Sequence, residues 1–320
     1  MLGWRWFAQR IGGALITLLG VTIVVFVVLR AIPGDTITAS LGIESGTLTP
    51  EQKASLQHFY GIDQPWPVQL WTWLTGVLRG DFGLSLVSGK PVAGLLATAL
   101  PVTIELAVLA ALIGTVAGLL LGVIAGNRPG RSADSVTQGV ALLGLAVPEF
   151  VLGTVVVAVL AEAFHYFPDT STFVPLTRSV PGNLSQVMYP ALVLAVAFAA
   201  NVMRTTRSEY VEVAQADYVR TARGRGVHPG RIRGAHILRN ATIPIVTLTG
   251  IQFGYLLGGT VIIEQIFALP GMGRLLFTSI SSRDYPVVQA TVLIIAALFV
   301  VVNLLVDLLY RVLDPRTRTA

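Results

Sequence analysis

The chain has 320 residues, of which 53% are hydrophobic and only 12% are charged, and it contains no cysteine. Soluble domains carry about 25% charged residues, and a soluble fold of this length could not bury so much apolar surface. A disordered chain would show the opposite composition, with low hydrophobicity and high charge. The composition therefore predicts an all-α membrane protein that crosses the bilayer several times, without disulfides. The net charge of +5 fits arginine-rich cytoplasmic loops rather than a nucleic-acid partner.

Six stretches are long and apolar enough to cross a bilayer as helices, for which about 20 residues are needed. They cover residues 11–29, 106–125, 136–161, 187–203, 241–263 and 287–306. The first stretch follows Arg5 and Arg10, as the apolar part of a signal peptide would. Its apolar run is too long for that, and no cleavage site with small residues follows, so we expect an uncleaved span.

The basic residues predict the orientation of these spans. With both termini in the cytoplasm, 15 of the 22 basic residues fall in inner segments and 7 in outer segments. Cytoplasmic loops of membrane proteins carry the excess of Lys and Arg, although long loops such as the first outer one follow this rule poorly. We expect residues 1–32 to hold the N-terminus and first span. Residues 33–95 should form an extracytoplasmic segment, and residues 96–320 a core of five spans with a long inner loop at 204–240.

The outer segment has two local features. Thr49-Pro50-Glu51-Gln52 has the residues that begin a helix. Trp66, Trp71 and Trp73 follow, and they are either anchors at the membrane interface or a docking surface for an external partner.

The sequence contains no recognisable catalytic centre. Residues 83–91 resemble a phosphate-binding loop, but five residues instead of four separate Gly83 from Gly89, and Pro91 stands where Ser or Thr is required after Lys90. The four histidines (His58, His165, His228 and His236) share no ligand-like spacing. We therefore expect a chain with neither enzymatic activity nor a cofactor of its own.

Charged residues within spans are costly and point to function. Glu105 and Asp307 lie near span ends, where a buried hydrogen bond or the membrane interface would explain them. Pro148 should bend the third span, and the adjacent Glu149 would then either line a polar path or satisfy neighbouring helices.

Glycines recur at a spacing of four in the fifth span. Gly250, Gly254 and Gly258 share one helix face and allow another backbone to approach closely. They indicate either helix packing within the chain or a subunit interface beside a transport pathway.

The inner loop contains an amphipathic helical pattern. Val211, Ala214, Tyr218 and Ala222 recur at helical spacing, and Gly224 is the first residue that would end a helix. The pattern predicts a helix pair or a bent helix, whose apolar stripe is covered by a partner protein or by another loop.

The inner loop also carries a resemblance to a known family. Residues 217–226, followed by His236, Asn240 and Pro244, resemble the EAA loop of ABC importer permeases, in the form typical of the dipeptide and oligopeptide (peptide/nickel) permeases. Motifs similar to those of that family occur in order along the chain, at residues 32–35, 60–65, 79–85, 147–150, 264–273, 283–286, and at Asn303, Asp307, Tyr310 and 314–316. Two departures are small: Gly224-Arg225 replaces the commoner Ala-Lys, and Ile237 replaces a usual Ala.

The resemblance implies a type I ABC importer permease with six transmembrane helices, in a bacterial or archaeal cell membrane. It implies a second homologous permease, two cytoplasmic ATPases that bind ATP and Mg, and an external substrate-binding protein. The residues expected to couple this chain to an ATPase are Glu212, Asp217, Tyr218, Arg220, Thr221, Ala222, Arg223 and Gly226.

The cargo implied by the resemblance is a di- or oligopeptide or a solute of similar size, with a nickel complex, glutathione or a heme-like molecule as alternatives. A secondary carrier or channel would explain the spans but not the amphipathic inner loop. A membrane enzyme is a third possibility, for which the sequence shows no constellation of residues.

Overall fold

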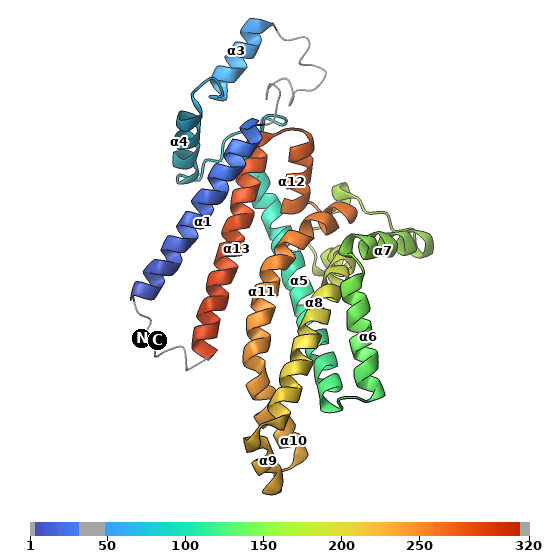
Figure 1. Ribbon diagram of the computed structural model, residues 1–320. Coiled ribbons are helices and arrows are strands. Elements are labelled where there is room, and N and C mark those ends of the chain that lie inside the picture. Colours follow the sequence, from blue (N-terminus) through green and yellow to red (C-terminus); the bar gives the residue numbers. More distant parts are fainter. Residues whose placement is uncertain (1–3, 32–48, 314–320) are drawn as a thin grey trace. The chain divides into compact units, whose positions relative to one another are not determined.

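The computed structural model describes residues 4–31 and 49–313 and consists almost entirely of helices (Figure 1). The sequence motifs at 32–35 and 314–316 and the first part of the expected outer segment lie outside the described residues. The chain divides into two units, which are described separately. One comprises Met1–Thr103 and Pro270–Val300, and the other comprises Ile104–Leu269 and Val301–Ala320.

The described part of the first unit combines helices from the N-terminal third of the chain with helices near its C-terminus. Its helices are α1 (Trp4–Ala31), α3 (Pro50–Phe59), α4 (Trp66–Val77), the start of α5 (Val92–Asn127), α12 (Met272–Ser281) and most of α13 (Tyr285–Leu313). The predicted helix start at Thr49 is confirmed, because its hydroxyl accepts a hydrogen bond from the Gln52 N–H while the Gln52 side chain accepts one from the Thr49 N–H.

A buried carboxylate joins distant parts of this unit. Asp284, which precedes α13, accepts hydrogen bonds from the Ser85 hydroxyl at 2.5 Å and from the Leu86 N–H at 3.0 Å. Both Ser85 and Asp284 are buried, so these contacts satisfy a charge that would otherwise be costly. They bring together the motifs at 79–85 and 283–286. Trp73 packs beside them against a core that includes Val92 and Met272.

The second unit contains the central helices. They are the rest of α5, α6 (Ser132–Ala146), α7 (Glu149–Phe164), a short turn η2 (Thr170–Thr172), α8 (Val180–Gln215), α9 (Asp217–Gly224), α10 (Pro229–Arg231), a π-helix η3 (Ile232–Leu238) and α11 (Arg239–Ile266). Helix α8 packs against both α6 and α11, and α9 and α10 lie at the shared end of α8 and α11 (Figure 1).

The apolar helices agree with the predicted spans, with one difference. Among the described residues, five helices (α1, α5, α8, α11 and α13) are long and apolar enough to cross a membrane, and α6 with α7 gives a sixth if the bent pair is one span. The third expected span is therefore two helices that meet at 95°. The break follows from Pro148, since proline lacks an N–H and drives the preceding Val147 into an extended conformation (φ −83°, ψ 118°).

Helices α5 and α8 approach closely along a row of glycines. Gly114, Gly118, Gly122 and Gly126 lie four residues apart on α5, and a Cβ atom at any of them would lie within 3.0 Å of an atom of α8. At Gly122, for example, it would lie 2.5 Å from the Cβ of Thr206. Only glycine permits this separation of the two backbones.

Candidate functional site

The expected coupling loop forms a compact lobe, which we define as residues 210–240. Helix α8 ends at Gln215, Ala216 adopts an extended conformation (φ −63°, ψ 145°), and α9 begins at Asp217. The chain therefore turns sharply and returns through α10 and the π-helix η3 to α11 (Figure 1). The predicted pair of helices is confirmed: the break between them falls at Ala216, and α9 ends at Gly224, the glycine expected to end the helix.

The lobe has its own small core. Tyr210, Val219, Ile232 and Ile237 are buried together, and Ala222 is partly buried against them. The apolar stripe predicted through Tyr218 is wrong at that position, because Tyr218 is exposed and the next residue, Val219, faces the core. The turn at Ala216 interrupts the helical register on which that stripe was based.

Tyr218 instead connects α9 to the start of α11. Its hydroxyl accepts a hydrogen bond from the Asn240 side-chain amide at 2.9 Å and lies 3.4 Å from the carbonyl oxygen of His236. Asn240 also donates to the carbonyl of His236 at 2.8 Å. These hydrogen bonds join α9 to the first turn of α11.

The residues expected to couple the chain to an ATPase lie mostly on the outside of the lobe. Seven are exposed and the eighth, Ala222, is partly buried; the exposed ones are Glu212, Asp217, Tyr218, Arg220, Thr221, Arg223 and Gly226. Gly226 has a positive φ of 76°, which favours glycine where the chain leaves α9. A pocket of about 520 Å³ adjoins them, with Arg223 and Arg233 in its lining. The lobe therefore has a polar, cationic surface over its small apolar core.

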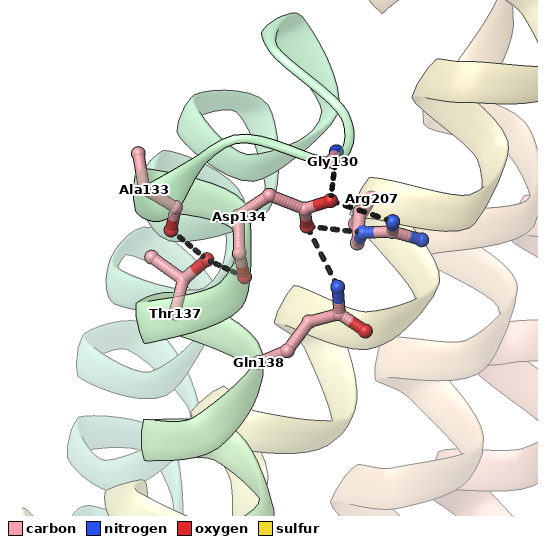
Figure 2. A network of polar contacts seen from close by, with 6 residues as sticks. All are labelled: Gly130, Ala133, Asp134, Thr137, Gln138 and Arg207. Atoms are coloured by element: carbon pink, nitrogen blue, oxygen red, sulfur yellow. Dashed lines mark hydrogen bonds and ion pairs between the residues drawn. The ribbon is translucent and has the colours of Figure 1, made fainter.

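An ion pair between a buried carboxylate and a partly exposed arginine joins α6 to α8 in the same unit. Asp134, which is 2% exposed, accepts hydrogen bonds from Arg207 Nε at 2.6 Å and Nη2 at 2.8 Å (Figure 2). It also accepts from the Gly130 N–H and the Gln138 side chain, each at 2.8 Å. This paired geometry is the strongest arrangement for an arginine and a carboxylate. Sequence reasoning missed it, because 73 residues separate the partners and neither stands in a recognisable motif.

The residues expected beside a transport pathway are not all brought together. The Glu149 carboxylate lies over α11, where a Cβ on Gly259 would meet Glu149 Oε2 at 2.9 Å. Pro148 is exposed at the bend between α6 and α7.

The three glycines expected on one face of α11 have different surroundings. Gly250 packs against Val306 of α13, Gly254 is buried, and Gly258 is exposed with no atom near its Cβ position.

Glu105 makes a hydrogen bond, which is the first of the two explanations expected for it. The side-chain amide of Asn183 on α8 donates a hydrogen bond to Glu105 Oε2 at 3.3 Å. Asn183 also donates to the carbonyl of Val174 at 3.1 Å, so Glu105 takes part in packing between α5 and α8.

Comparisons with known proteins agree with this arrangement. Residues 118–319 match the family of binding-protein-dependent transport system inner membrane components, and residues 3–107 match the N-terminal family of the same membrane components. A protein of Brucella abortus (strain 2308) named as a peptide transport system permease is 40% identical over 97% of this chain and 98% of its own length. The glutathione transport system permease protein GsiC of Salmonella typhi is 36% identical over 97% of each chain.

Solved structures show the same fold. The MetNI methionine ABC transporter in an inward-facing conformation matches with a TM-score of 0.56 and 18% identity, over 69% of this chain and 96% of the solved one. A chain of an amino acid ABC transporter matches with a TM-score of 0.50, also at 18% identity, over 68% of this chain and 94% of the other. At this identity the match concerns the fold alone.

Proposed function

This chain belongs to the family of binding-protein-dependent transport system inner membrane components, and from that membership we propose that it carries short peptides or solutes of similar size across the cell membrane. The observation that supports the cargo best is the 40% identity, over nearly the whole chain, to a protein named as a peptide transport permease. Glutathione, itself a short peptide, fits the same proposal through the GsiC relative. A nickel complex or a heme-like molecule remains the alternative cargo.

The partners follow from the family. ATP-hydrolysing subunits and a substrate-binding protein work with permeases of this kind, and we propose two ATPases, one external binding protein and a second permease for this chain. ATP hydrolysis then takes place in the partner ATPases and not in this chain. Binding and hydrolysis of ATP would shift the permease pair between outward-open and inward-open states, which requires a bias of several kcal/mol, about 5.5 to invert a 1:99 population.

The lobe at residues 210–240 is the proposed contact with an ATPase. Most of the exposed residues expected to couple it to an ATPase lie on α9. Val219 packs this helix into the core of the lobe, and the hydrogen bond between Tyr218 and Asn240 links it to α11. A push on α9 would therefore reach α11 without first unfolding the lobe. Ala222→Asp and Gly226→Trp should both uncouple ATP hydrolysis from transport, but they also disturb the lobe's own packing and its positive-φ turn.

Arg220→Glu is a cleaner test of this contact, because the Arg220 side chain is 72% exposed and belongs to no core. We expect the assembled complex to lose at least about tenfold in transport per ATP hydrolysed, since reversing a charge in a docked interface costs several kcal/mol. The matched control is Arg178→Glu, the same change at an exposed arginine between α7 and α8. Equal transport in both variants would contradict the assignment of α9.

The second permease is proposed to pack on the exposed face of α11. Ile251, Tyr255, Gly258 and Ile262 lie on one side of this helix and are exposed, with Tyr255 at 70%. A photo-crosslinking residue at position 255 should capture the second permease in the membrane, whereas one at Leu120, an exposed position of α5, should not. Capture from both positions or from neither would argue against this face.

Uptake by the reconstituted complex tests the cargo. With its binding protein present, labelled di- and oligopeptides should stimulate ATP hydrolysis and accumulate in proteoliposomes. If peptides do neither while a nickel complex or a heme-like solute does both, the peptide cargo is wrong and the permease role is retained.

A further inference from the structure

The unit formed by residues 1–103 and 270–300 contains a pocket to which the proposed function assigns no role. Its volume is about 540 Å³, and its described lining comes from the end of α1, the segment from α3 to Leu86, and the start of α13. This size is typical of sites for small molecules. Six aromatic residues contribute to its walls: Phe59, Tyr60, Trp66, Trp73, Phe82 and Tyr285.

Three buried hydrogen-bond donors in the lining have no partner. They are Nη1 of Arg30, Nε1 of Trp73 and Nε2 of Gln289, all without an acceptor among the described residues. Gln289 is only 4% exposed. Buried polar atoms are normally paired, and an unpaired one costs free energy. Three donors gathered around one pocket therefore indicate an acceptor that comes from outside the described chain.

The cationic donor is held firmly in position. Arg30 Nε donates to Gln69 Oε1 at 2.8 Å, and the guanidinium carbon lies 3.4 Å from the centre of the Phe26 ring. Gln69 is itself fixed, because its amide donates to the carbonyls of Ile62 at 2.9 Å and Gln64 at 2.7 Å. Both Arg30 neighbours thus engage other parts of the guanidinium and leave Nη1 for a ligand.

Asp81, the acidic residue in the described lining of the pocket, has a hydrogen-bond partner of its own. Asp81 accepts a hydrogen bond from the Gly83 N–H at 2.9 Å, which stabilises the turn after α4. Asp81 is exposed, whereas the three unpaired donors are buried. The interior of the pocket therefore offers donors and a positive charge, with aromatic surface around them.

We infer that this pocket binds a small anionic ligand that joins a carboxylate or phosphate group to an apolar body. The oxygens would accept hydrogen bonds from Arg30, Trp73 and Gln289, and the apolar part would lie against the aromatic walls. Two sources share this chemistry: a dissolved solute with a carboxylate, and the phosphate of an anionic lipid at the end of α1. The inference does not depend on which cargo the permease carries.

Tryptophan quenching by brominated probes tests the site in the full-length chain embedded in nanodiscs. In one arm, N-acetyl-4-bromophenylalanine is titrated into phosphatidylcholine nanodiscs. In the other arm, the mole fraction of a dibrominated phosphatidylglycerol is raised and compared with the equally brominated phosphatidylcholine. We expect saturable quenching in at least one arm; the soluble arm would identify a solute, and quenching that depends on the headgroup would identify a lipid.

Variants connect the quenching to the pocket. Arg30→Gln should weaken the midpoint at least tenfold, and Trp73→Phe should remove the Trp73 share of the saturable signal and leave that of Trp66. The matched controls are Arg79→Gln and Trp71→Phe, both at exposed positions outside the lining, which should leave the midpoint unchanged.

A second measurement keeps the test decisive if Arg30→Gln fails to fold. Gln289→Leu removes an unpaired buried donor, so it should leave the thermal unfolding midpoint of the ligand-free chain unchanged or higher, while it weakens probe binding at least threefold. No saturable quenching in either arm, or the same midpoint in the wild type and Gln289→Leu, would overturn the inference.

Discussion

At the scale of single residues, Asp134 shows how a buried charge organises this protein. Its carboxylate receives hydrogen bonds from the turn after α5, from its own helix and from Arg207 of α8. An ion pair with this geometry positions two helices more than it stabilises them, because desolvation offsets much of the attraction. The loss of one partner is a different matter, since Asp134 is buried and Arg207 is only 28% exposed, so the remaining charge is poorly solvated.

We expect Asp134→Ala to lower the stability of the folded chain by about 1–3 kcal/mol, because it removes the acceptor of four hydrogen bonds while the 28% exposed Arg207 side chain keeps part of its solvation. Asp134→Asn should cost less, because an amide oxygen can still accept a hydrogen bond from Arg207. The measurement is the thermal unfolding midpoint in detergent, with Glu162→Ala at an exposed position of α7 as the control. The double variant Asp134→Leu with Arg207→Met should recover most of the loss. A double variant no more stable than Asp134→Ala would show that the pair contributes more than charge compensation.

At the scale of helices, the glycine row of α5 sets the distance to α8. We expect Gly122→Val to destabilise the chain by about 1–3 kcal/mol, as overpacking in a well-packed interior does. Gly139→Val on α6 is the matched control, because no atom lies within 4 Å of its Cβ position. Chemical unfolding of both variants gives the comparison. Equal midpoints would mean that α5 and α8 can separate without cost.

Local signals in the sequence predicted local structure well. The capping box at Thr49, the apolar spans and the bend at Pro148 each depend on residues within one or two helical turns, and all three are present. The pairing of helices was not predictable in the same way. Rows of glycine at a spacing of four occur on both α5 and α11, and the spacing alone does not tell which helix each row contacts.

In the candidate site, too, local structure could be predicted from the sequence and tertiary contacts could not. The helix pair could be predicted from the apolar pattern that runs from Val211 to Ala222 and from the family resemblance. The exposure of Tyr218 could not, because it depends on one extended residue, Ala216, whose side chain carries no turn signal. The roles of the coupling residues and of the pathway residues stay predictions until the variants are measured.

At the scale of the whole molecule, the orientation in the membrane is the main prediction. The cysteine-free chain allows single cysteines to report accessibility. Ser55→Cys in α3 should react with an impermeant thiol reagent in intact cells, whereas Ser132→Cys at the start of α6 should react only after the membrane is opened. Both positions are exposed in the structure, so a difference reflects the side of the membrane. The reverse pattern would place the termini outside.

Contacts between distant segments link motifs that the sequence shows only separately. Ser85 and Asp284 lie 199 residues apart, and each belongs to a motif in which the sequence resembles the permease family. The hydrogen bond between them means that each motif supplies one partner of the same buried contact.

The bent pair of α6 and α7 also bears on how the chain is inserted during synthesis. Helix α6 has 15 residues, about 23 Å at 1.5 Å per residue, which is shorter than the roughly 30 Å of a bilayer's hydrocarbon core. Its carboxylate at Asp134 finds its counter-ion only when Arg207, 73 residues later, has left the ribosome. We therefore expect α6 to take its final place only after α8 has been synthesised and Arg207 can pair with Asp134.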